Sequence, residues 1–157
     1  MARVKKLTDY LEANGVPYST GTHAEAFTAQ EVAAAQHVPG RMVAKTVVVK
    51  TERRFLMAVV PAHRKVDLAH LRALLGEGEV RLAQESEFAR LFPECEVGAM
   101  PPFGNLFGLD VVADSSLAQN ERITFSAGTH RETLTVSYKD FERLEKPRLE
   151  RLVLEED

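Results

Sequence analysis

Two valine-rich segments separated by a short polar turn constrain the fold of this 157-residue chain more than any other feature. Residues 42–50 and 55–61 are apolar and rich in β-branched side chains, and the sequence "TERR" lies between them. Such a pattern predicts a β-hairpin of two largely buried strands.

A lysine interrupts the first of these strands. Successive strand side chains point to opposite faces, so Lys45 should share a face with Val43, Val47 and Val49. An ammonium group among valines loses hydration, which is costly unless a partner compensates or its pKa falls. Three explanations remain open: the side chain extends outward to water, pairs with a carboxylate, or faces a ligand.

Helical and strand patterns follow one another irregularly along the rest of the chain. Thr28 and Glu31 form a capping-box pattern that predicts a helix at 29–37, and spaced leucines predict another at 67–76. Further helices are expected at 4–13, 85–92 and 137–145, and further strands at 16–19, 79–83, 110–114, 122–128 and 133–137.

Hairpins mixed with separate helices, without regular strand–helix alternation, favour an α+β fold. We expect a mixed, largely antiparallel sheet of about six to seven strands, barrel-like and flanked by helices. No linker composition interrupts the chain, so one domain over residues 1–157 is expected.

The charge balance limits the partners that the chain can have. A net charge of −3 argues against the broad basic surface of nonspecific DNA binders, although a local basic patch and a few phosphate contacts remain possible. Apolar runs of transmembrane length are absent, and the N-terminus lacks a secretory pattern. We therefore expect a cytoplasmic protein with neither membrane nor DNA as a partner.

Common catalytic motifs are missing from the sequence. The five histidines show no i, i+4 pair of the kind that binds zinc on a helix, so no metal or other cofactor is predicted. A single cysteine, Cys95, cannot form an internal disulfide. Two features remain: Lys45 followed by Thr46, and the loop "GAMPPFG", in which Gly98 would allow close backbone approach. Alone the loop indicates only a tight turn, whereas with Lys45 it suggests an anion or oxyanion site.

Six motifs occur along the chain in the order "FTAQEVAAA", "VAKTVVVK", "AVVPAHRKVDL", "VRLA", "VGAMPPFG" and "FSAGTH". In this order they resemble the YbaK family, and the resemblance extends over about residues 4 to 144. These proteins are free-standing relatives of the editing domain inserted in bacterial prolyl-tRNA synthetases. The resemblance implies a trans-editing enzyme that hydrolyses the ester of a mischarged aminoacyl-tRNA. Its partners would be the aminoacyl-tRNA 3′ end and prolyl-tRNA synthetase.

The resemblance also implies site residues. Lys45 matches the strand lysine on which activity in the family most depends, and Gly98 with Pro102 matches the Gly-x-x-x-Pro loop of the pocket. Family members place further pocket residues at the positions of Phe27, Thr46, Ser126 and Gly128, and a histidine of the synthetase-inserted domains lies near His130. Candidates for setting the pocket size are Met100, Phe27 and Phe103.

Two other functions stay open at this point. One is a non-catalytic module of the same fold that binds the tRNA 3′ end or a nucleotide. Another is an interaction partner of a synthetase that docks through the acidic tail, although such a tail is more often simply solvated. The sequence does not select among alanine, cysteine, serine, threonine and 2-aminobutyrate as the amino acid removed.

Overall fold

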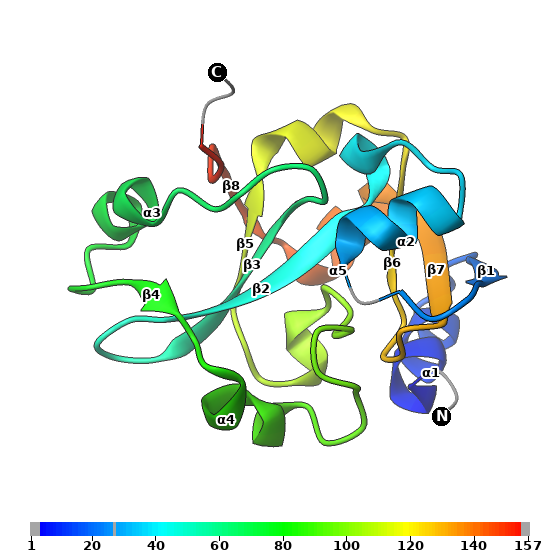
Figure 1. Ribbon diagram of the computed structural model, residues 1–157, viewed down its shortest axis with the longest axis horizontal. Helices are drawn as coiled ribbons and strands as arrows, with labels where there is room; N and C mark the ends of the chain where they lie inside the picture. The colour runs from blue at the N-terminus through cyan, green and yellow to red at the C-terminus, as the bar shows by residue number, and fades with distance from the viewer. Residues whose placement is uncertain (1–3, 27, 155–157) are drawn as a thin grey trace.

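The computed structural model describes residues 4–26 and 28–154, and Figure 1 shows the arrangement of its elements. The described strands are β1 (Ser19–Thr22), β2 (Ala44–Lys50), β3 (Phe55–Pro61), β4 (Arg81–Leu82), β5 (Val111–Asp114), β6 (Arg122–Ser126), β7 (Glu132–Ser137) and β8 (Arg148–Glu150). The α-helices are α1 (Lys5–Ala13), α2 (Ala29–Ala35), α3 (Leu68–Leu75), α4 (Glu85–Phe88) and α5 (Tyr138–Glu145).

These strands form two sheets, and the predicted α+β class with a mixed sheet is confirmed. The larger sheet has the order β4-β2-β3-β5-β8, with β4, β2 and β3 antiparallel and with β5 and β8 added in parallel. An antiparallel sheet of order β1-β7-β6 meets it through a single bridge between Val43 and Thr124. The described part of the chain thus has eight strands rather than six to seven, and they do not close into a barrel.

The predicted hairpin is present, with Ala44 opposite Pro61 and Lys50 opposite Phe55. In Figure 1, β2 and β3 cross the middle of the molecule, with α3 towards one end and the smaller sheet towards the other. Val48 packs in the core cluster that also contains side chains of the smaller sheet, whereas Val49 packs in a second cluster against α3. This alternation places Lys45 on the same side of β2 as Val49, as the pattern predicts.

Capping residues fix where the helices begin and end. The Thr28 hydroxyl accepts a hydrogen bond from the Glu31 amide at 3.1 Å, which starts α2. Asp67 caps α3 in the same way through the His70 amide at 3.0 Å, and Gly76 ends it in the left-handed conformation. None of the described helices is long and apolar enough to cross a membrane.

Two elements differ from what the sequence predicts. The strand expected at 16–19 begins only at Ser19, because the Val16 amide bonds the Leu11 carbonyl at 2.9 Å and completes the end of α1. The C-terminal strand was not predicted: β8 extends the larger sheet beside β5. The three acidic residues that end the tail, 155–157, lie outside the described residues. Beyond β8, Leu152 and Val153 are buried, and the Asp114 carboxylate accepts from the Leu152 amide at 2.8 Å.

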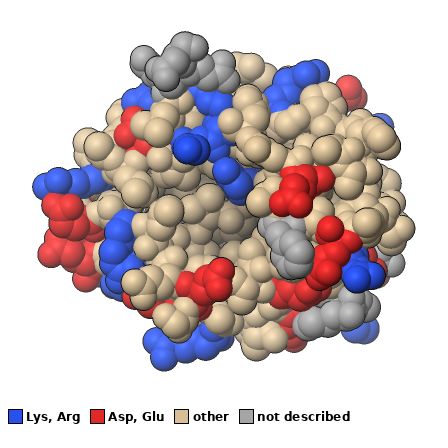
Figure 2. All heavy atoms as spheres, viewed as in Figure 1, with Lys and Arg blue, Asp and Glu red and all other residues tan. Residues whose placement is uncertain are grey.

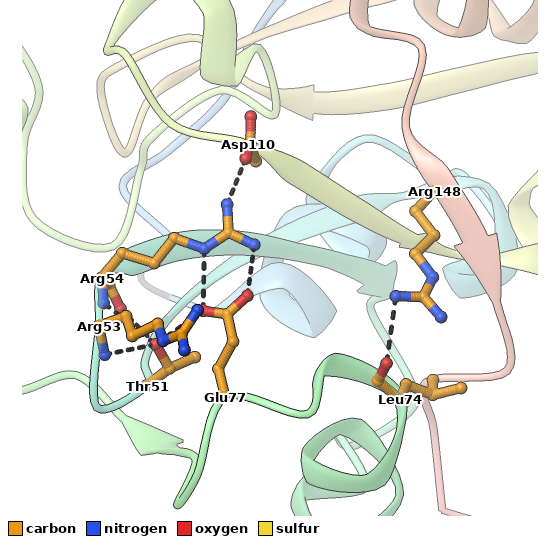
Figure 3. Close-up of polar contacts among 7 residues, drawn as sticks. All are labelled: Thr51, Arg53, Arg54, Leu74, Glu77, Asp110 and Arg148. Atoms are coloured by element: carbon orange, nitrogen blue, oxygen red, sulfur yellow. Dashed lines mark hydrogen bonds and ion pairs between the residues drawn. The ribbon is translucent and has the colours of Figure 1, made fainter.

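At the turn of the hairpin, an arginine ties three segments together (Figure 3). Arg54 donates to Glu77, which follows α3, and pairs with Asp110, which precedes β5. The Thr51 hydroxyl accepts from the Arg53 and Arg54 amides, both at 3.0 Å, and closes the turn. These contacts hold the end of the hairpin that lies away from the lysine.

Candidate active site

A cavity of about 570 Å³ opens beside the edge of β2. The two residues of β4 pair only with Val49 and Lys50, so the first half of β2 has no described strand on that side. Both faces of this half-strand therefore contribute to the cavity, through Lys45 and Val47 on one face and Thr46 on the other. Figure 2 shows the molecular face with a central hollow and with Lys and Arg atoms near its rim.

The Lys45 side chain is half-buried and enters this cavity. Its ammonium group donates to the backbone carbonyl of Arg64 at 2.9 Å and forms no ion pair with a carboxylate in the described part of the chain. Burial lowers the pKa of Lys45, and the nearby charge of Lys65 lowers it further. Pairing with a carboxylate, one of the explanations left open by the sequence, does not occur among these residues.

Thr46 contributes a hydroxyl group that lacks a partner. Its Oγ1 is buried and makes no hydrogen bond to the described residues, although the side chain lines the cavity. A buried hydroxyl without a partner costs free energy, because it has lost water and gained nothing. Met100 and Ser126 also line the cavity, and Met100 is almost fully buried.

The loop before Met100 presents its backbone to the cavity at Gly98, whose φ of +88° is rarely adopted by residues with a side chain. The Gly98 amide donates to the Met100 sulfur at 3.3 Å. Thioether sulfur is a weak acceptor, so an oxygen atom of a ligand could replace it at little cost. This loop therefore offers a fixed amide donor at the cavity wall.

His130 holds this loop from behind. Its Nε2 lies 2.8 Å from the Val97 carbonyl, which can only accept, so the histidine donates this bond. The turn that carries His130 is tied to the loop by two further bonds, from the Glu96 amide to the Gly128 carbonyl at 2.8 Å and from the Gly128 amide to the Ala99 carbonyl at 2.9 Å. His130 is buried and does not line the cavity.

Five of the residues predicted from the sequence thus lie together around the cavity. The five are Lys45, Thr46, Gly98, Met100 and Ser126. Pro102, Gly128 and His130 lie outside the lining, and Phe27 falls outside the described residues. Phe103 is fully buried in an aromatic cluster with Phe125 and Phe141 and does not reach the cavity.

Sequence reasoning missed part of the lining. His63, Arg64 and Lys65 lie two to four residues after the end of β3 and contribute to the cavity, as do Glu85 and Phe88 from α4. A run of three basic residues shortly after a buried strand was a visible signal for the first group. No sequence signal pointed to α4, because only tertiary packing brings it to β2.

The site lacks an activated thiol. Burial raises the pKa of Cys95 to about 11, so the sulfur stays protonated at neutral pH. A half-buried cation, an amide donor and a hydroxyl around one cavity are suited to binding an anion and to stabilising negative charge on a carbonyl oxygen.

Comparison with known proteins identifies relatives of this chain. Residues 23–144 match the family model of the aminoacyl-tRNA editing domain. The chain is 29% identical over 89 residues to the proline–tRNA ligase of Bacillus cytotoxicus and 32% identical over 77 residues to that of Thermosipho africanus. These matches cover 57% and 49% of the chain but only 16% and 14% of the ligases.

A solved structure agrees in fold. A protein described as a candidate trans-editing enzyme for prolyl-tRNA synthetase superimposes with a TM-score of 0.83 at 23% identity, covering 96% of each chain. The match of the family model extends over most of the sequence and contains every residue that lines the cavity. On this evidence, the chain belongs to the aminoacyl-tRNA editing domain family.

Proposed function

We propose that this protein is a trans-acting deacylase that hydrolyses the ester of mischarged tRNA, with tRNA-Pro carrying a small non-cognate amino acid as its substrate. The observation that carries the proposal is Lys45, a half-buried cation that opens into a cavity without a described carboxylate partner. An anionic ligand would supply the missing partner and stabilise the charged form of the lysine.

In this proposal Lys45 binds and orients the end of the tRNA. Its ammonium now rests on the Arg64 carbonyl, a neutral acceptor. A phosphate oxygen would form a charge-assisted bond, which is roughly twice as strong as a bond between neutral groups. Binding the tRNA end would therefore bring the ester linkage of the terminal ribose into the cavity that Thr46 and Gly98 line.

The amide of Gly98 is the proposed oxyanion donor. Water attacks the ester carbonyl, negative charge develops on the carbonyl oxygen, and the Gly98 N–H would exchange its sulfur acceptor for this oxygen. The ester bond to the ribose oxygen then breaks, and this oxygen takes a proton as the free amino acid leaves. Neither a side-chain nucleophile nor a metal is needed for these steps.

Cavity size is the proposed basis of selectivity. Met100 and Phe88 are buried side chains that restrict the space beside β2. A difference of one methylene group is worth only about 1–3 kcal/mol in binding, so exclusion of the larger prolyl group should be more effective than preference among small side chains. The matched ligases act on proline, which supports tRNA-Pro as the tRNA.

The decisive experiment measures release of the amino acid from tRNA-Pro charged separately with alanine, cysteine, serine, threonine and 2-aminobutyrate. We expect at least one to be hydrolysed well above the rate in buffer, whereas prolyl-tRNA-Pro should be stable. Lys45→Met keeps the aliphatic stem and removes the charge, so it should lower kcat/KM by about a hundredfold or more.

Two results would count against this function. If none of the five charged tRNAs is hydrolysed but the tRNA still binds, the protein is instead a non-catalytic module for the tRNA 3′ end. If Lys45→Met retains full activity and folds normally by circular dichroism, the lysine lacks the proposed role.

A further inference from the structure

The cavity gathers positive charge in a chain that is negative overall. Among the described residues, its lining contains Lys45, Arg64 and Lys65 but only one carboxylate, that of Glu85. The whole chain has 20 basic and 23 acidic residues, so this local balance is reversed. Like charges placed close together repel one another, and their proximity is tolerated best where an anion binds between them.

The C-terminal residues bind the segment that carries two of these cations, Arg64 and Lys65. The Leu154 amide donates to the Lys65 carbonyl at 2.9 Å, and the Arg64 guanidinium bonds the Leu154 carbonyl. Val153 forms an antiparallel bridge with Val66, next in the chain. Residues 152–154 lie beyond the segment matched by the family model, so the backbone of this basic loop is fixed by a part of the chain outside that match.

Of these cations, Lys65 is the one best placed to take a new partner at the surface. Arg64 is already engaged with Leu154, and Lys45 donates to the Arg64 carbonyl. The Lys65 side chain is exposed, and no ion pair joins it to a carboxylate within residues 4–26 and 28–154. It is close enough to Lys45 for its charge to lower the pKa of that lysine.

We propose that Lys65 and Lys45 together bind one phosphate, the last internucleotide phosphate of the tRNA 3′ end. This inference rests on the proposed function, because it assumes that the aminoacylated ribose occupies the cavity. Moving away from the ester, the first charge along the RNA is the 5′ phosphate of the same nucleotide. Lys65 lies at the exposed side of the cavity and Lys45 on its buried side, so the phosphate would lie between them.

The test measures binding of an uncharged, fluorescently labelled RNA hairpin that ends in single-stranded CCA. Its matched counterpart carries a neutral methylphosphonate at the last internucleotide linkage. We expect Lys65→Ala to weaken binding of the normal hairpin by roughly three- to tenfold at low salt. The slope of log K against log salt should become less steep by about 0.7, the value for one phosphate contact on a single strand.

The methylphosphonate identifies which phosphate is bound. It should weaken binding to the unaltered protein more than Lys65→Ala does, because it removes the contacts of both lysines. It should weaken binding to Lys65→Ala by a smaller factor than binding to the unaltered protein, because only the Lys45 contact is left to lose. Lys139→Ala is the control, since Lys139 is exposed on α5 and does not line the cavity. This variant should bind both hairpins as the unaltered protein does.

Three outcomes would overturn the inference: unchanged binding by Lys65→Ala, additive effects of the variant and the methylphosphonate, or no binding of the hairpin at all. Because the assay uses uncharged RNA, it does not depend on turnover. Deacylation without a Lys65 effect would refute only this inference, whereas a Lys65 effect without deacylation would refute only the proposed function.

Discussion

At the scale of single residues, two glycines with positive φ connect backbone conformation to the site. Gly98 lines the cavity with φ of +88°, and Gly128 sits behind the loop with φ of +97°. A Cβ at Gly98 would lie 3.4 Å from His130 Cε1, whereas a Cβ at Gly128 would lie 2.3 Å from Val4 Cγ2. A side chain at Gly98 would therefore disturb the cavity, whereas a side chain at Gly128 would disturb packing against Val4, the residue before α1.

Gly98→Ala should reduce kcat/KM of deacylation by about tenfold or more, because the backbone must shift and carry the amide donor with it. The strain should also lower the free energy of unfolding by about 1–2 kcal/mol. Gly108→Ala is the matched control, since Gly108 has a φ of +70°, open space around its Cβ position and no place in the cavity. Equal loss of activity in both variants would argue against a role for the Gly98 amide.

Gly128→Ala should lower the free energy of unfolding by about 2–3 kcal/mol, through overpacking against Val4 and backbone strain. Urea denaturation of the purified variant measures this change. In the double variant Gly128→Ala with Val4→Ala, removal of the clash should recover part of the loss. Strictly additive destabilisation in the double variant would show that Val4 is not the obstacle.

At the scale of elements, a helix or strand could be predicted from the sequence where the residues that determine it lie within that element or next to it. The hairpin, α2 and α3 were predictable because valine runs and caps at Thr28 and Asp67 act within a few residues. β8 was not, since it is a single leucine between two oppositely charged residues and forms a strand only beside β5. The alternation of side chains along β2 likewise predicted which face of the strand carries Lys45. It could not predict that the basic residues after β3 lie beside this lysine, because tertiary packing brings them there.

Leu152 tests the importance of the C-terminal segment. Its side chain is fully buried, so Leu152→Ala should lower the free energy of unfolding by about 2–4 kcal/mol, as is usual for removal of a buried leucine. Leu154→Ala is the control, because this side chain is 47% exposed and its backbone bonds to the basic loop are retained. Similar denaturation midpoints for the two variants would contradict the packing described for the segment.

At the scale of the whole molecule, ion pairs between separate elements couple stability to pH. The Arg54 guanidinium lowers the pKa of Glu77, and Arg81 lowers the pKa of Glu87 to about 2. Burial raises the pKa of Glu145, which acts in the opposite sense. The pKa of Asp67 is lowered as well, chiefly by the hydrogen bond from the His70 amide. Three carboxyl groups with a lowered pKa against one with a raised pKa favour greater stability at neutral than at acidic pH.

The folded protein should therefore lose stability as the pH falls from about 5 towards 2. A carboxyl group with a lowered folded-state pKa stabilises the fold above its unfolded pKa, and this contribution disappears as the pH drops through the folded pKa. Arg54→Met removes the cation that lowers the pKa of Glu77, so its stability should change less steeply over this range. Denaturation midpoints at several pH values measure both slopes, and parallel curves would contradict the role of Arg54.

The open half of β2 has a consequence for solubility as well as for binding. A strand edge without a neighbour can pair with the edge of a second molecule, and proteins commonly prevent this with a charged side chain in the exposed strand. Lys45 lies in that half of β2, so its charge would oppose intermolecular sheet formation wherever the cavity is vacant. Variants that neutralise Lys45 should consequently be prone to aggregate at high protein concentration, a change that light scattering would detect independently of any loss of activity.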